Sequence, residues 1–165
     1  MTIRYRAVEP QDNVSLARVI RACLEEFDAV KQGTVYFDPT TDALYELFQT
    51  PNSSYIVAEG INDDGTATLV GGCGLFPTEG LPADTIELVK LYLAPSVRGL
   101  GVGKALMEKC LDTARTYAYK AVYLESLPEL TIAVPMYERM GFVHLDCALG
   151  VSGHGGCSIW MLKQL

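Results

Sequence analysis

The sequence contains no long hydrophobic run and opens without an apolar leader. No stretch approaches the roughly 18 consecutive apolar residues that a membrane-spanning helix requires. Residues 1–6, MTIRYR, begin at once with strand-like alternation and lack the hydrophobic core of a signal peptide. We therefore expect a cytoplasmic protein with no membrane partner.

Histidine is rare, and the cysteines form no recognisable framework. There are two histidines and five cysteines, an odd number spread along the chain without a C-x-x-C pair. This pattern disfavours both a disulfide scaffold and a zinc site, so no metal is predicted. No Cys/His/Asp pattern indicates a catalytic thiol. Cys23 and Cys110 fall within apolar periodic stretches, where we expect buried thiols that behave as small hydrophobic groups.

Basic residues are outnumbered by acidic ones. Thirteen Lys and Arg against twenty Asp and Glu give a formal net charge of −7. Nucleic-acid-binding proteins usually carry a basic stripe, and its absence here excludes nucleic acid as an expected partner. The acidic balance agrees with attraction of a cationic ligand, and equally with a surface that only keeps the protein in solution.

The chain does have enough apolar residues for one folded core. Its 165 residues are 49% hydrophobic and 20% charged, as in ordinary globular proteins and unlike disordered or fibrous chains. This length suits one domain, and we expect residues 1–165 to form it.

Hydrophobic periodicity and turn residues predict seven strands and four helices. Strands are expected at residues 3–8, 54–58, 66–76, 86–93, 121–125, 142–147 and 157–162. Helices are expected at residues 14–27, 40–48, 102–119 and 131–140. The order β-α-α-β-β-β-α-β-α-β-β indicates an α/β fold with a mixed sheet and helices on its faces. Residues 86–93 are mostly apolar on both faces, which predicts a central strand covered above and below.

A glycine-rich turn, Arg98–Lys104 (RGLGVGK), joins this strand to the third helix. Glycines let a backbone approach a ligand closely, and the free N–H groups of a first helical turn point outward with the helix dipole behind them. Such a turn binds phosphate or pyrophosphate. The alternative is a tight strand-to-helix connection without a ligand.

The spacing of the turn separates three phosphate-binding patterns. A nucleotide P-loop needs a glycine where Arg98 stands and a hydroxyl where Ala105 stands. The G-x-G-x-x-G pattern of dinucleotide folds also fails in either register. A third pattern, [QR]-x-x-G-x-[GA], is met in full by Arg98, Gly101 and Gly103.

With its flanking segments, the turn resembles the GNAT superfamily of N-acetyltransferases. Similar members read E-L-x-x-L-Y before the loop, and this chain has Glu87–Tyr92 (ELVKLY). They carry A-x-x-x-Y-x-x-x-G-F later, matched by Ala133, Tyr137, Gly141 and Phe142. The resemblance covers the whole chain and implies a mostly antiparallel sheet of about seven strands flanked by about four helices. Many members have an asparagine where this chain has Leu130, so a cofactor contact at that position is lost or replaced.

The resemblance also implies a co-substrate, acetyl-coenzyme A. Its pyrophosphate is expected to bind the backbone amides of the turn, that is, Arg98, Gly99, Leu100, Gly101, Val102, Gly103 and Lys104. Main-chain N–H groups of the central strand stabilise the oxyanion in the family, and here the matching residues are Leu91 and Leu93.

Two side chains are candidates for proton transfer. Glu87 is an acid in an apolar strand, at the same offset from the glycine loop as a catalytic glutamate of similar proteins, and burial raises the pKa of such a group. Its alternative is a strand-end acid paired with a nearby Lys or Arg. Tyr137 matches the family residue that protonates the coenzyme A thiolate, and its alternative is a packing residue between helix and sheet.

The acceptor side is less defined by the sequence. The loop 150–156 borders the acceptor cleft in similar proteins, and His154 within it could bind or deprotonate substrate. Glu79 and Asp38 could face an ammonium group from neighbouring loops. The alternatives are an ordinary loop histidine and two solvated acids.

Together these features predict an acetyl-coenzyme A-dependent N-acetyltransferase. The expected acceptor is a primary amine of a small or amino-acid-like molecule, attacked directly in a ternary complex. Two alternatives stay open, namely a protein or peptide N-acetyltransferase and a non-catalytic acetyl-coenzyme A sensor. A homodimer also stays open, since dimers are common in similar proteins.

Overall fold

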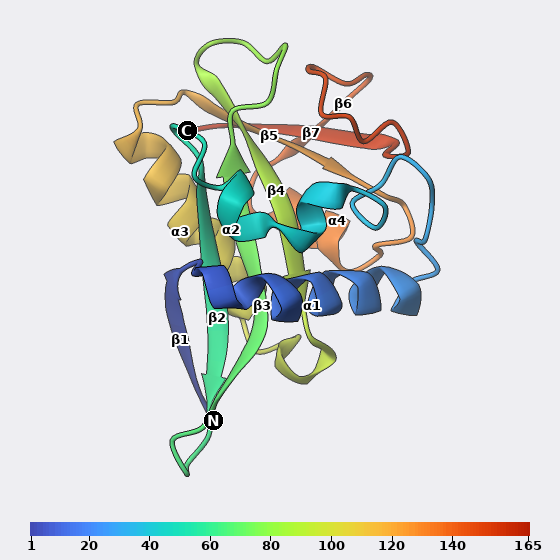
Figure 1. Cartoon of the computed structure of the whole chain (residues 1–165). Helices are drawn as coiled ribbons and strands as arrows, with labels where there is room; N and C mark the ends of the chain where they lie inside the picture. The colour runs from blue at the N-terminus through green and yellow to red at the C-terminus, as the bar shows by residue number, and fades with distance from the viewer.

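The computed structural model of the protein describes every residue from Met1 to Leu165. Seven strands form one sheet in the order β1-β2-β3-β4-β5-β7-β6 (Figure 1). β4 and β5 run parallel, and every other neighbouring pair is antiparallel. The strands are β1 (Thr2–Ala7), β2 (Ser54–Ile61), β3 (Ala67–Phe76), β4 (Thr85–Leu93), β5 (Ala121–Ser126), β6 (Val143–Leu145) and β7 (Ile159–Gln164). The predicted fold class is confirmed.

Helices cover both faces of this sheet. They are α1 (Asn13–Glu26), α2 (Leu44–Leu47), α3 (Val102–Thr116) and α4 (Ala133–Arg139), with the 3-10 turns η1 (Pro10–Asp12), η2 (Pro39–Asp42) and η3 (Pro95–Val97). α1 and α2 lie in front of the sheet in Figure 1, and α3 lies behind it. No helix combines the length and the apolar character needed to cross a membrane.

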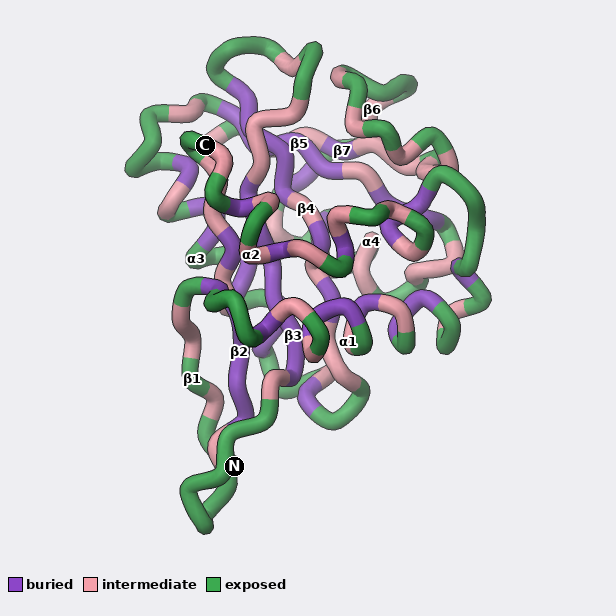
Figure 2. The backbone as a smooth tube through the Cα atoms, in the orientation of Figure 1, coloured by how far each residue is buried: buried purple, intermediate pink, exposed green.

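Each face of the sheet has its own hydrophobic core. One core joins the sheet to α1 and α2 through residues such as Leu16, Ile20 and Leu44. The other joins it to α3 and α4 through residues such as Leu106 and Tyr137. Figure 2 shows the buried backbone following the central strands, as predicted for a strand covered on both sides.

Several helices and strands begin or end at other residues than the sequence predicts. The helix expected at residues 40–48 is split into η2 and the single turn α2. The helix expected from residue 131 begins at Ala133, and Pro135 lies in its first turn, where the missing N–H has no helical partner to lose. The strand expected at 142–147 shortens to β6. Cys23 and Cys110 are buried, as expected, and no disulfide forms.

A β-bulge interrupts the pairing of β3 with β4. The register steps from the Gly72–Tyr92 pair to the Gly74–Val89 pair, which leaves one extra residue on β4. Lys90 lies within this step and has φ of 53°, a left-handed conformation that lysine rarely adopts. The bulge therefore shifts the alternation of β4 in the middle of the sheet.

Beyond the bulge, β4 separates from β5. Their parallel pairing ends at Leu88 and Leu124, whereas β4 continues to Leu93. The last residues of β4 therefore keep β3 as a neighbour on one side and lose β5 on the other.

Candidate active site

The end of β4 turns main-chain donors toward the gap left by β5. The N–H of Ala94 donates to the carbonyl of Val70 at 2.8 Å, and Tyr92 faces Gly72 on the same neighbouring strand. Because N–H groups alternate along a strand, that of Leu93 points away from β3, and Leu91 lies in the bulge. Leu93 directs its N–H toward the thiol of Cys23 on α1. The residues proposed from sequence as oxyanion donors thus sit at the open side of the strand.

The glycine turn leads from β4 into α3 and exposes its backbone. Gly99 and Gly101 have φ of 75° and 80°, and a Cβ at either position would meet no protein atom within 4 Å. Gly101 is the N-cap of the 15-residue helix α3. The backbone that leads into α3 is therefore unobstructed at these two glycines, as a turn that binds phosphate at a helix N-terminus requires.

Arg98 anchors the turn to its surroundings. Its Nε donates to the carbonyl of Leu93 at 3.0 Å, and one terminal nitrogen donates to Oε1 of Glu26 at 2.7 Å. The guanidinium also lies 5.2 Å from the ring centre of Phe27 on α1. The side chain thus fastens the turn to β4 and α1, and the main-chain N–H groups are left as the exposed donors.

A cavity of about 440 Å³ opens in front of this turn, and we call it the glycine-loop cavity. Five of the seven turn residues line it, together with the strand end and α4: Leu91, Leu93, Arg98, Gly99, Gly101, Gly103, Lys104, Met136 and Arg139 among others. Leu100 is instead 65% exposed, and Val102 is buried in the core.

Two further cavities adjoin it along β4. A small bridging cavity of about 50 Å³ shares Leu91, Tyr92 and Leu130 with the glycine-loop cavity. A larger one of about 530 Å³, the His154 cavity, shares Glu87 and Lys90 with the bridging cavity. The three cavities therefore follow one another across the separated strands.

Glu87 lies at the junction of the bridging and His154 cavities. Glu87 is only 3% exposed, and burial raises the pKa of its carboxyl to about 7. The Thr78 hydroxyl donates to Oε2 and opposes this shift, whereas the charge of Glu125 reinforces it. A carboxyl with a pKa near neutrality can both accept and release a proton.

Tyr137 projects from α4 to the bridging cavity. The residue is 5% exposed, and burial raises the pKa of its hydroxyl well above the usual value. The phenol is therefore neutral at pH 7 and carries a proton that it can donate. Glu87 and Tyr137, 50 residues apart in sequence, line the same small space.

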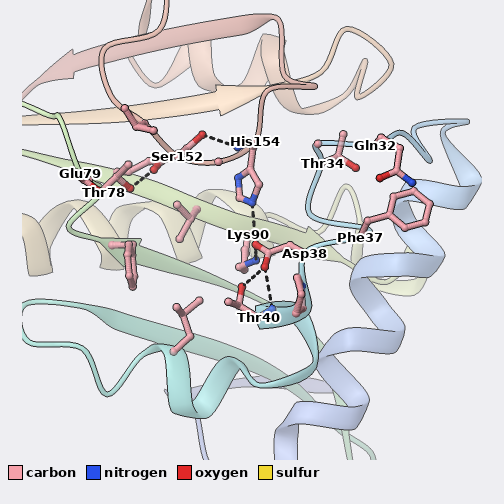
Figure 3. Close-up of a pocket in the computed structure, with 18 residues that line it drawn as sticks. Gln32, Thr34, Phe37, Asp38, Thr40, Thr78, Glu79, Lys90, Ser152 and His154 are labelled. Atoms are coloured by element: carbon pink, nitrogen blue, oxygen red, sulfur yellow. Dashed lines mark hydrogen bonds and ion pairs between the residues drawn. The ribbon is translucent and has the colours of Figure 1, made fainter.

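Asp38 and His154 meet across the His154 cavity (Figure 3). Nε2 of His154 lies 2.9 Å from Oδ2 of Asp38, and Nζ of Lys90 lies 3.2 Å from the same oxygen. The Thr40 N–H and hydroxyl donate to Oδ1 at 2.9 and 2.7 Å. Although burial opposes it, these contacts lower the pKa of Asp38. Its charge is therefore already compensated within the protein.

The loop that carries His154 is attached to both neighbouring loops. The N–H of Val151 donates to the carbonyl of Glu79 at 2.8 Å, and the N–H of Gly156 donates to the carbonyl of Gly33 at 2.9 Å. Glu79 lines the cavity with an exposed side chain and forms no ion pair. These contacts fix the outer wall of the His154 cavity.

Sequence reasoning did not identify three polar residues of this region. Lys90 occupies the bulge, Glu125 lies near the end of β5 and acts on Glu87 through its charge, and Ser152 donates to Oε2 of Glu125 at 2.7 Å. A signal was present for two of them, because Lys90 and Glu125 are charges inside otherwise apolar strands. No group of three or more His, Cys, Asp or Glu side chains is arranged to hold a metal ion.

Comparison with known proteins agrees with this geometry. The sequence profile of the Acetyltransferase (GNAT) family matches residues 20–142. A protein of Escherichia coli K12 named "Uncharacterized N-acetyltransferase YjgM" is 37% identical over 161 residues, which cover 97% of this chain and 93% of that protein. The chain belongs to the GNAT acetyltransferase family and is an acyltransferase, which confirms the resemblance seen in the sequence.

Solved structures show the same fold. The chain resembles an acetyltransferase of the GNAT family from Staphylococcus aureus Mu50 with a TM-score of 0.84 at 18% identity, covering 99% of both chains. It also resembles the PaiA N-acetyltransferase of Thermoplasma acidophilum in complex with coenzyme A, with a TM-score of 0.74 at 20% identity over all of both chains.

Proposed function

We propose that this protein transfers the acetyl group of acetyl-coenzyme A to the primary amine of a small, amino-acid-like molecule. The adjacency of the three cavities, which share lining residues, carries the proposal. A thioester carrier in the glycine-loop cavity and an amine in the His154 cavity meet in the bridging cavity, where Glu87 and Tyr137 both lie. We infer that residues 1–165 act as one unit, since all three cavities are built on one sheet.

The glycine-loop cavity suits the carrier. Gly99 and Gly101 leave open space before the N-terminus of α3, as a pyrophosphate requires. A relative with the same fold binds coenzyme A. Acetyl-coenzyme A supplies the activated thioester. In this proposal the main-chain N–H groups of Leu91 and Leu93, at the end of β4, stabilise the charge that develops on the thioester oxygen.

Glu87 and Tyr137 divide the proton transfers. An alkyl ammonium must lose a proton before it can attack, and Glu87 accepts it directly or through a water molecule. Its pKa of about 7 keeps a large share of the group in the basic form at neutral pH. Tyr137 remains protonated and donates its proton to the departing sulfur. Both groups act in one ternary complex, without a covalent enzyme intermediate.

The size of the acceptor side favours a small molecule. The His154 cavity is about 530 Å³, within the range of small-ligand sites, and its outer wall is fixed by the contacts of Val151 and Gly156.

The test is thiol release from acetyl-coenzyme A in the presence of a panel of amines and peptides. Release with small amines supports the proposal. Release with peptides alone identifies a peptide acetyltransferase. Calorimetric binding of coenzyme A without thiol release for any acceptor identifies a sensor.

A further inference from the structure

Lys90 is a buried ammonium at the junction of the His154 and bridging cavities, and proton transfer by Glu87 and Tyr137 does not use it. Its side chain is 3% exposed, although it lines both cavities. The bulge of β4 places it there, with its main chain held in the left-handed conformation. Burial of an ammonium costs free energy unless acceptors replace its hydration.

The protein supplies only part of that replacement. Nζ of Lys90 contacts Oδ2 of Asp38 at 3.2 Å and Oγ1 of Thr41 at 3.4 Å, both longer than a charge-assisted hydrogen bond of about 2.7–2.9 Å. An ammonium has three N–H donors, and the third has no acceptor in the protein. Oδ2 of Asp38 is also shared with His154, so one oxygen serves two donors. The ammonium of Lys90 therefore has an N–H donor available to a ligand in the His154 cavity.

The position of Lys90 relative to Glu87 indicates what would use this donor. Both residues line the His154 and bridging cavities, and their charges influence each other's pKa. An α-amino acid carries its amine and its carboxylate on the same carbon. Resting on the proposed function, we propose that the acceptor is an α-amino acid whose carboxylate binds the ammonium of Lys90, next to His154, while its amine faces Glu87.

The remainder of the His154 cavity accommodates the side chain of such an acceptor. Beyond the polar cluster, its apolar wall consists of Phe37, Leu47, Phe76, Val89 and Val151. Phe37 is 48% exposed and Val151 is 71% exposed, so both present apolar surface at the mouth. An apolar side chain would cover this surface, and amino acids with aliphatic or aromatic side chains are therefore the first to test.

The wild-type protein tests the proposal without any substitution. We would compare kcat/KM for L-leucine, L-leucinamide and 3-methylbutylamine, and for L-phenylalanine, L-phenylalaninamide and 2-phenylethylamine. The amides keep the shape but lower the pKa of the amine, so kcat/KM is compared per concentration of unprotonated amine, and the remaining difference reports the carboxylate charge. Loss of charge-assisted hydrogen bonds should reduce kcat/KM about tenfold to 100-fold for the amides and the decarboxylated amines. Equal or faster acetylation of these analogues overturns the proposal.

The variants Lys90→Gln and His154→Gln test whether the preference for the amino acid over the decarboxylated amine depends on the polar cluster of Lys90, Asp38 and His154. The expected result is a fall in the ratio of kcat/KM between L-leucine and 3-methylbutylamine, toward one for Lys90→Gln. A Lys90 that only holds Asp38 would change both substrates by the same factor and leave the ratio intact, which overturns the role assigned to it. Thermal unfolding and coenzyme A binding of each variant report on its folding, and the wild-type comparison stands even where a variant does not fold.

Failure of this inference differs from failure of the proposed function. Thiol release with decarboxylated amines but no preference for amino acids removes the carboxylate site and leaves the acetyltransferase assignment in place. The absence of thiol release with every amine and amino acid removes both.

Discussion

Thr78 donates a hydrogen bond from Oγ1 to Oε2 of Glu87, and both residues line the His154 cavity. The bond stabilises the charged form of the carboxyl and so lowers the pKa that burial raises. Glu125 acts in the opposite direction through its charge. Burial is the main cause of the raised pKa of Glu87, and Thr78 and Glu125 are two neighbours through which this pKa can be changed in opposite directions.

Thr78→Val should raise the pKa of Glu87, because the substitution removes the hydrogen bond and keeps the shape of the side chain. The acidic limb of the pH profile of kcat/KM should move to higher pH. The matched counterpart is Glu125→Gln, which removes the repelling charge and should move the limb to lower pH. Shifts of the same sign in both variants would contradict this account of the site.

Glu87→Gln should slow acetyl transfer by roughly 10²–10⁴, as expected for loss of a general base. The wild-type profile of kcat/KM should rise with pH through about 7, where Glu87 loses its proton, and the variant should lack this limb. Steady-state rates between pH 5.5 and 9 with a fixed amine provide the measurement. Calorimetry with coenzyme A serves as the control, since the variant should bind it like the wild type.

The same substitution should change the pH dependence of stability. The carboxyl has an ordinary pKa of 4.5 and a folded pKa of about 7, so unfolding releases a proton between these values. The contribution of Glu87 to the free energy of unfolding of the wild type therefore falls as pH rises from about 4.5 to about 7, and it stays at the lower value above that range. Relative to wild type, Glu87→Gln should gain on the order of 3 kcal/mol across this interval. Urea unfolding at pH 4.5 and 8 measures the difference, and a constant gap between the two proteins argues against the raised pKa.

Tyr137→Phe should lower kcat roughly 10²-fold while the protein stays folded. The ring keeps its place against Phe142, at 6.1 Å between ring centres, and only the proton donor is lost. If Tyr137 only packs the helix against the sheet, the substitution should lower thermal stability and leave the turnover per folded molecule unchanged. Thermal melting and single-turnover rates, measured on one preparation, distinguish the two.

Gly101→Ala should weaken coenzyme A binding by about tenfold or more, equivalent to loss of one or two backbone contacts. The added methyl group would project into the space that faces the pyrophosphate. Gly65→Ala is the matched control, because Gly65 also has a left-handed φ, of 83°, and open surroundings, but lies in the β2–β3 hairpin. Both variants should lose about 1 kcal/mol of stability, and only Gly101→Ala should lose affinity.

The parts of the fold that local sequence encodes were predictable. Periodicity gave the order of strands and helices, and the glycine spacing located the turn before α3. Tyr137 was found through its motif, and Glu87 as a charge in an apolar strand.

The contacts within the polar cluster could not be predicted from the sequence. Asp38 and His154 are separated by 116 residues, and no local pattern links them. The bulge is equally hidden, because a lysine at position 90 gives no sign that its φ is positive. Long-range contacts and backbone irregularities depend on the assembled sheet, and the assembled sheet decides which candidates face one cavity.

The left-handed backbone at Lys90 has a consequence for engineering. A side chain in that conformation costs about 1–2 kcal/mol, and a buried ammonium adds a desolvation cost. Lys90→Gly relieves both costs, and it also removes the ammonium that faces the Asp38 carboxylate. A variant of this kind would keep its glycine turn and its hold on the carrier, yet it would no longer distinguish a zwitterion from a plain amine.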